Sequence, residues 1–165
     1  MKKTTILAAL FVLATAGAAT AGGTEDSLGV GTEFQINDIA GGVSLNYDLG
    51  KFHVGGFLGF VDGGGDDDTD YSVGARFFYH VHSTAMSDFG VGGSLGFVSI
   101  DGTGPMGDDR DTLLFLEPSF QIRAFIAANV ALSFTGGIVL ALVDADGTAV
   151  TGGLTGTAGI HYYFF

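Results

Sequence analysis

The chain has 165 residues, a mean hydropathy of +0.43, 29 glycines and no cysteine, with six basic against 18 acidic side chains. A net charge of −12 excludes a basic nucleic-acid-binding surface, and the absence of cysteine excludes disulfides and a lipid anchor on cysteine. After the first 21 residues no apolar run is long enough for a membrane-spanning helix, so the high hydropathy is spread over short pieces.

An export signal is predicted at the N-terminus. Lys2 and Lys3 form a positive region, residues 6–14 an apolar segment of signal-peptide length, and residues 19–21 an A-x-A cleavage site. A retained membrane anchor is the rival interpretation, but the apolar run is short and no stop-transfer pattern follows. We therefore expect a signal peptide over residues 1–21 and one mature domain over residues 22–165, with a net charge of −14.

Eight stretches of alternating apolar and small or polar residues follow. In chain order they lie at residues 28–36, 43–48, 53–60, 71–82, 89–97, 114–124, 130–140 and 154–164. The clearest is the fourth, in which the odd positions are apolar and the even positions are mostly small or polar. Period-two alternation over stretches of this kind is typical of membrane-spanning strands with one face to lipid and one to the lumen. Pro118 interrupts the sixth stretch, and we expect a local bulge there because proline cannot donate to a sheet ladder.

The connections between the stretches differ in length. Short ones lie at residues 48–51, 82–87 and 126–129, and longer acidic ones at 62–70, 101–111 and 143–148. Short periplasmic turns and longer external loops are the rule in bacterial outer-membrane barrels. The sequence therefore predicts an all-β fold, an eight-stranded antiparallel up-and-down transmembrane barrel with both termini in the periplasm. A soluble periplasmic β-sandwich is a weaker alternative.

The signal, the eight strands, the short turns and the terminal Phe165 resemble the small eight-stranded outer-membrane barrels, namely the OmpA transmembrane domain, OmpX and the opacity proteins. The resemblance covers the whole mature chain and rests on pattern alone. It implies location in a bacterial outer membrane, a monomer, and outer-membrane lipids and the barrel assembly machinery as partners. The aromatic girdle and the assembly signal would then include Tyr162, Tyr163, Phe164 and Phe165.

One feature of the last strand departs from this resemblance. In such families the last residue and the third from last usually face lipid, whereas here Phe165 and Tyr163 have the opposite parity to Tyr162 and Phe164. Two explanations stay open at this stage: a bulge that resets the register near the end, or a different parity for the whole last strand.

Four charged side chains are predicted to face the lumen: Glu33, Arg76, Glu117 and Arg123. An unpaired charge at this depth is costly, so we expect cations and anions to pair across the lumen and plug it. The bore of an eight-stranded barrel is just wide enough for side chains to fill. The alternative is a narrow ion-selective channel.

The histidines are candidate metal ligands or catalytic bases. All four are expected near the periplasmic rim, where interfacial or hydrogen-bonding roles are favoured over a metal site: His53, His80, His82 and His161. A lipid-modifying outer-membrane enzyme is a second alternative, but it would need a base near the outer leaflet, and no histidine is expected there. The sequence thus predicts no enzymatic activity.

The acidic loops are the strongest candidates for interaction. They form either a solvated surface or a weak site for Ca²⁺ or Mg²⁺, with oxygen ligands from Asp66, Asp67, Asp68, Asp70, Asp144 and Asp146. No full calcium-binding loop is present, and no other cofactor is expected. The resulting hypothesis is a plugged outer-membrane barrel that displays acidic loops and has a structural or surface-interaction role.

Overall fold

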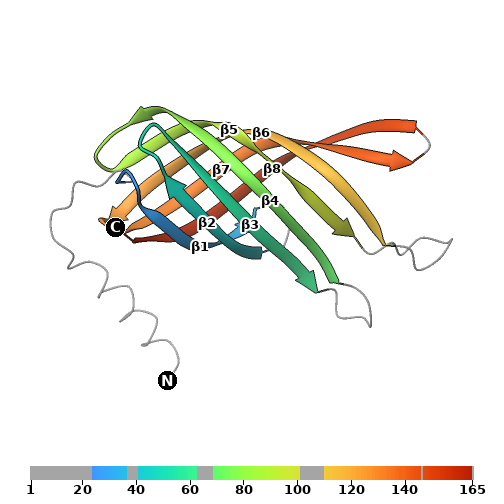
Figure 1. The fold of residues 1–165 in the computed structure, drawn as a ribbon, viewed down its shortest axis with the longest axis horizontal. Helices are drawn as coiled ribbons and strands as arrows, with labels where there is room; N and C mark the ends of the chain where they lie inside the picture. The colour runs from blue at the N-terminus through green and yellow to red at the C-terminus, as the bar shows by residue number, and fades with distance from the viewer. Residues whose placement is uncertain (1–23, 37–40, 63–68, 101–109, 146, 165) are drawn as a thin grey trace, which may run out of the picture.

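The computed structural model describes residues 24–36, 41–62, 69–100, 110–145 and 147–164, and in these residues eight strands form one closed barrel (Figure 1). The expected signal peptide lies outside the described residues. The strands are β1 (Leu28–Gln35), β2 (Gly41–Asp48), β3 (Phe52–Asp62), β4 (Thr69–Ser83), β5 (Ser87–Ile100), β6 (Asp111–Ala127), β7 (Val130–Ala145) and β8 (Gly147–Phe164).

Each strand is antiparallel to both of its neighbours, and β1 closes the sheet by pairing with β8. Leu28 lies opposite both Tyr47 of β2 and Phe164 of β8. Over the length of this β1–β8 ladder, from Leu28 with Phe164 to Gln35 with Thr157, closure leaves no exposed sheet edge. The predicted eight-stranded antiparallel barrel is therefore confirmed.

The two faces of each strand differ as the alternation predicts. On β2, Val43 and Leu45 are each 52% exposed on the outer face, whereas Ser44 and Asn46 point inward and are each 1% exposed. The other strands also present exposed apolar side chains outward, among them Phe34, Leu58, Phe60, Phe77, Tyr79, Val91, Phe97, Phe120, Phe134 and Ile160. An apolar exterior around a polar interior is the arrangement of a barrel surrounded by lipid.

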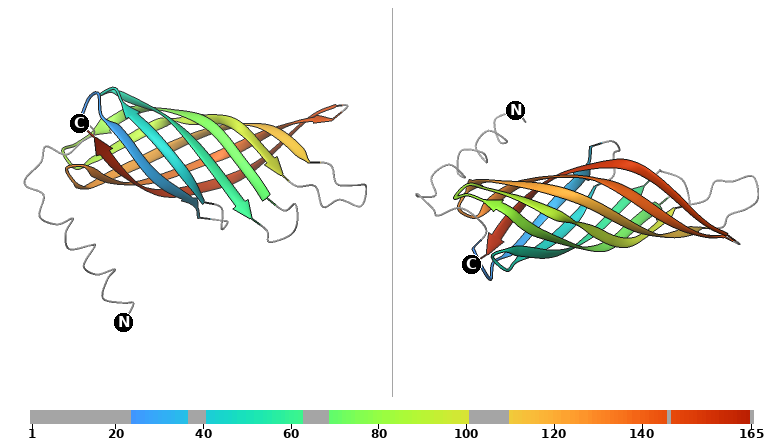
Figure 2. Two further views of the ribbon diagram at one scale, coloured as in Figure 1. Left: turned by 60° about the horizontal axis from the view of Figure 1, so that its bottom comes forward. Right: turned by 90° about the horizontal axis from the view of Figure 1, so that it is seen from above.

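The two ends of the barrel differ in their connections. Short turns join β2 to β3, β4 to β5 and β6 to β7 at one end, where β1 also begins and β8 ends (Figure 2). We call this end the turn end and the opposite one the loop end. The wall is uneven at the loop end, because β1 and β2 have eight residues each whereas β7 and β8 have 16 and 18.

The long connection expected at residues 143–148 is wrong. The β7–β8 ladder continues to the pairs Asp144 with Thr148 and Ala145 with Gly147, so the two strands form a hairpin that turns within a few residues. The β-branched residues near the tip favour strand, and Gly147 suits a tight turn.

The bulge expected at Pro118 is also wrong. Pro118 pairs with Gly93 in an unbroken β5–β6 register, and the β6–β7 ladder lacks pairs at residues 117 and 118 without changing its register. The proline therefore interrupts a ladder without inserting a residue. A bulge lies instead between His80 and His82, and it places His82, expected to face the lumen, opposite the outward-facing Phe89 in an exposed position.

The parity of β8 is continuous to its end. The β1–β8 register is unbroken from Gln35 with Thr157 to Leu28 with Phe164, so no bulge resets it. Tyr163 consequently faces the lumen, while Tyr162 and Phe164 face outward.

Gly92 permits close approach of β5 to β4, and Gly92→Ala is expected to reduce the folded fraction strongly. The new Cβ would collide with the backbone carbonyl oxygen of Phe77, and overpacking of this kind costs about 1–3 kcal/mol. The folded fraction is measured as the band that shifts on boiling in SDS gels. Gly153→Ala is the matched control, because its Cβ would meet no atom within 4 Å. Equal folded fractions for the two variants would contradict this packing.

Candidate functional site

The lumen near the turn end is crossed by one arginine. Arg123 on β6 donates from Nη1 to Asp48 Oδ2 on β2 at 2.6 Å and from Nη2 to Asp88 Oδ2 on β5 at 2.7 Å. Nη1 also donates to the hydroxyl oxygen of Tyr163 on β8 at 3.0 Å. All four side chains are buried, and we call them the arginine cluster. One guanidinium thus ties together four strands across the bore.

Two histidines border the arginine cluster. His80 Nδ1 lies 2.8 Å from the carbonyl oxygen of Gly50, so it carries the proton of the ring and donates to that carbonyl. Its Nε2 lies 3.0 Å from Arg123 Nη2, and because a guanidinium nitrogen can only donate, Nε2 accepts from the arginine. His53 Nδ1 lies 2.8 Å from the same nitrogen of His80. His80 therefore contacts the arginine directly, and His53 contacts His80.

A second ion pair lies farther from the turn end. Arg76 on β4 forms a bidentate pair with Glu33 on β1, with both N–O distances 2.7 Å. The carboxylate also accepts from Ser44 at 3.1 Å and lies 3.2 Å from His161 Nε2. The guanidinium carbon of Arg76 lies 4.9 Å from the centre of the Phe57 ring. Fork-to-fork pairing of this kind fixes both side chains in one geometry.

Above this pair, toward the loop end, the lumen contains a cavity of about 330 Å³, which we call the upper cavity. Glu33 and Arg76 line it, and so do apolar side chains of several strands, including Phe57, Val98, Phe115 and Val139. Glu117 of β6 also lines it and accepts a hydrogen bond from the Thr155 hydroxyl. The lumen is therefore crossed by charged side chains toward the turn end and hollow toward the loop end.

The four charged side chains expected in the lumen do face it, but they do not all pair with one another. Glu33 pairs with Arg76, whereas Arg123 pairs with Asp48 and Asp88. Glu117 pairs with a hydroxyl. Sequence reasoning missed Asp88, although it shares the inward parity of the β5 glycines and directly follows a short turn.

The expectation that Tyr163 belongs to the aromatic girdle is wrong. Its side chain is 1% exposed and its hydroxyl binds Arg123, whereas Tyr162 and Phe164 are 45% and 56% exposed on the outer face. A continuous strand necessarily turns every second residue inward. Phe165 lies outside the described residues.

The acidic residues considered for divalent cations are largely outside the description. This applies to Asp66, Asp67, Asp68 and Asp146, and to the side chain of Asp144 on β7. Asp70 lies on β4 rather than in a loop and lines the upper cavity. Within the described residues, no group of three or more histidine and carboxylate side chains is placed to hold a metal ion.

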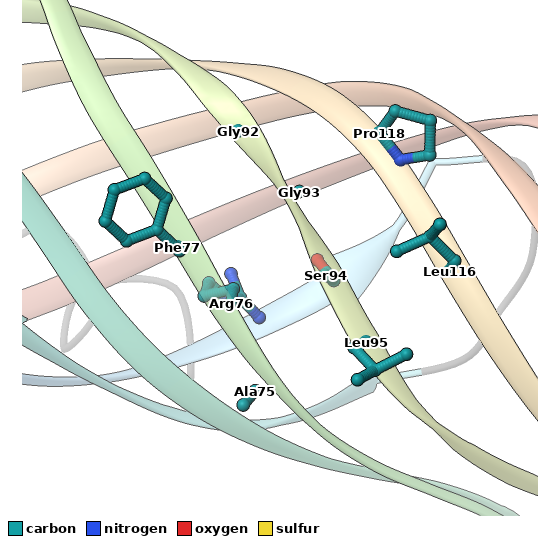
Figure 3. Close-up of a pocket in the computed structure, with 9 residues that line it drawn as sticks. All are labelled: Ala75, Arg76, Phe77, Gly92, Gly93, Ser94, Leu95, Leu116 and Pro118. Atoms are coloured by element: carbon teal, nitrogen blue, oxygen red, sulfur yellow. The ribbon is translucent and has the colours of Figure 1, made fainter.

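The outer wall carries a shallow depression of about 440 Å³ over β4, β5 and β6. Gly93 has no side chain to fill the wall between Phe77 and Pro118, the residues opposite it on the two neighbouring strands (Figure 3). Leu95 and Leu116 complete its apolar border.

In the described part of the chain, no helix is long and apolar enough to cross a membrane.

Comparison with solved structures identifies the architecture. The N-terminal β-barrel domain of Pseudomonas aeruginosa OprF superposes with a TM-score of 0.63 at 13% identity, over 85% of this chain and 98% of that domain. The chain has the fold of a small eight-stranded outer-membrane barrel. Neisserial surface protein A aligns with a TM-score of 0.45 at 18% identity, over 84% of this chain and 94% of that protein. No protein-family model matches the barrel, and neither does any curated protein sequence.

Arg123→Met is expected to lower the free energy of unfolding of the barrel by about 3–5 kcal/mol, because Asp48 and Asp88 would be left buried without their cation. Urea titration of the detergent-solubilised barrel, followed by the heat-modifiable band, measures this. Arg110→Met, at an exposed arginine, is the control and should cost less than about 1 kcal/mol.

The triple variant D48N, D88N and R123M should recover part of that loss, because it leaves no buried charge unpaired. An R123M barrel as stable as the R110M barrel would show that the arginine cluster does not hold the strands together.

Tyr163→Phe is expected to destabilise the barrel by about 1 kcal/mol, because it removes the hydroxyl that accepts from Arg123 at 3.0 Å. The neighbouring change Tyr162→Phe alters an outward-facing side chain and should stay within about 0.5 kcal/mol of the unmodified barrel. The same urea titration compares the two variants. Equal effects, or a larger effect for Y162F, would argue against an inward role for the Tyr163 hydroxyl.

Proposed function

We propose that this chain is an integral barrel of a bacterial outer membrane, with the turn end in the periplasm and the loop end at the cell surface. The band of exposed apolar side chains around the wall supports residence in lipid. The fold shared with the OprF barrel domain supports the same location. The orientation rests on the rule that periplasmic turns are short and external loops long.

The proposed role is structural or interactive, with a lumen that does not conduct. The observation that carries this proposal is the set of hydrogen bonds made by Arg123. Its guanidinium nitrogens lie 3.0 Å or less from side-chain oxygens of Asp48, Asp88 and Tyr163 on three other strands. A pathway for solutes would require the guanidinium to leave two buried carboxylates, and breaking such a pair costs several kcal/mol. The cluster therefore acts as a stopper near the periplasmic end.

A narrow channel is the second candidate. The upper cavity favours it, because about 330 Å³ of the lumen is hollow from the Glu33–Arg76 pair toward the loop end. A channel would need the arginine cluster to rearrange, whereas a stoppered barrel would keep the cavity as a blind recess.

We assign no catalytic role to the barrel. His80 contacts Arg123, His53 contacts His80, and His161 contacts Glu33, all within the lumen rather than at the loop end. His82 lies beside the turn between β4 and β5. This placement argues against the alternative of a lipid-modifying enzyme, which needs a base beside the outer leaflet.

The proposed partners follow from the same placement. They are the surrounding lipids and, through the outward aromatic residues of β8, the barrel assembly machinery. The barrel itself is proposed to be a monomer, because β1 pairs with β8 and closes the sheet within one chain. Weak binding of Ca²⁺ or Mg²⁺ by the acidic connections at the loop end is a further part of the proposal.

Planar lipid bilayers test the central claim. The purified barrel, shown to be folded by its mobility shift on boiling, is expected to give no unitary current steps in salt solution, because the arginine cluster blocks the lumen. Regular steps from the same folded sample would overturn the stopper and favour the channel. Loss of the mobility shift together with release from membranes into buffer would instead contradict the membrane barrel itself.

A further inference from the structure

We propose that the upper cavity binds a small amphiphilic cation, an ammonium group on an apolar body, with the ammonium at Glu117 and the body against the aromatic wall. The cavity is at the lower end of the size range of small-molecule sites, about 300–1,000 Å³. Like those sites it is lined mainly by apolar groups with a few converging polar ones. The inference goes beyond the structural role and holds whether or not the barrel conducts.

The charge of the cavity selects the sign of the ligand. Glu33 and Arg76 at its floor neutralise each other through two short hydrogen bonds. Glu117 accepts from the Thr155 hydroxyl, and across the described residues no cation forms an ion pair with it. Among the described residues that line the cavity are three carboxylates, those of Glu33, Asp70 and Glu117, and one guanidinium, that of Arg76. The cavity therefore keeps an excess negative charge in surroundings where such a charge interacts strongly with a cation.

The aromatic wall favours the same sign. The rings of Phe57 and Phe115 have centroids 6.2 Å apart, and both line the cavity. Aromatic faces attract ammonium groups, and the guanidinium of Arg76 already occupies one such position over Phe57. An anion would meet the carboxylates and the ring faces unfavourably. A bare metal ion is not favoured either, because within the described residues no three carboxylate or histidine side chains are placed to hold one.

The cavity is held open by glycines. The Phe57 ring packs 2.5 Å from the place a Cβ on Gly74 would take, and the Phe115 ring 3.0 Å from the corresponding place on Gly96. Each ring therefore packs against the backbone of a glycine in the barrel wall and leaves the centre of the lumen open. A recess formed in advance lowers the ordering cost of binding.

The test compares three probes with the same chain, namely octylammonium, octanol and octanoate, added to the barrel in lipid nanodiscs. The readout is the NMR shift of the methyl groups of Val98 and Val139, which line the cavity and so separate binding in the lumen from partition into lipid. We expect saturable shifts with octylammonium at concentrations where octanol and octanoate give little.

Two variants locate the site. Glu117→Gln should weaken octylammonium binding about tenfold or more, as expected for the loss of a charged hydrogen-bond partner. Asp26→Asn removes a carboxylate at the turn end and should leave binding unchanged. Ala141→Phe adds a ring at a residue that lines the cavity and should abolish the shifts by filling the recess.

Each result decides the proposal. Octanol or octanoate that binds as well as octylammonium would overturn the cationic specificity, and binding that survives Ala141→Phe would overturn the location. If Glu117→Gln fails to show the heat-modifiable band, the probe series on the unmodified barrel and the Ala141→Phe variant still decide the question. No saturable shift with any probe would leave the cavity without a ligand of this class.

Discussion

The narrow bore of an eight-stranded barrel is the constraint on which the rest of this structure depends. Eight strands enclose a lumen only wide enough for side chains, so each large inward residue must be offset by small ones at the same level. The inward face of β5 carries Gly90, Gly92 and Gly96, and these positions leave room for Phe78 and Phe115 from the neighbouring strands. The high glycine content is thus a matter of fit within the lumen rather than of flexibility.

The same constraint divides the lumen into two parts. Near the turn end, Arg123, Asp48 and Asp88 occupy the bore with tyrosine and histidine around them. Burying three charges costs desolvation energy, which the short hydrogen bonds offset only while all partners are present. Toward the loop end, aromatic rings lie against glycines, and a recess remains. One barrel therefore combines a stopper that favours rigidity with a cavity that is suited to a ligand.

Much of the fold could be predicted from the sequence, because period-two alternation reports directly which side chains face the lumen. The inward positions of Glu33, Arg76, Glu117 and Arg123 follow from local parity alone. Their pairing does not, since it depends on the stagger of strands around the barrel. Arg123 meets Asp48 across 75 positions of sequence, and nothing local to either residue indicates the other.

The errors have equally physical causes. The position of Tyr163 among aromatic residues suggests the girdle, yet its parity places it inward. The bulge at residues 80–82 and the hairpin tip at Ala145 depend on ladder geometry over a few residues, which alternation does not determine. The upper cavity could not be predicted from the sequence, because it depends on the side-chain conformations of Phe57 and Phe115.

The position of Tyr163 on the final strand has a consequence for how the protein assembles. Arg123 obtains its last hydrogen bond only when β8 has arrived, and β8 is fixed only by meeting β1. An open seven-stranded intermediate would hold a polar cluster that is incomplete and accessible to water. The seam and the cluster are therefore completed in one event, so the barrel should form and come apart as a single cooperative unit, without a stable half-built state.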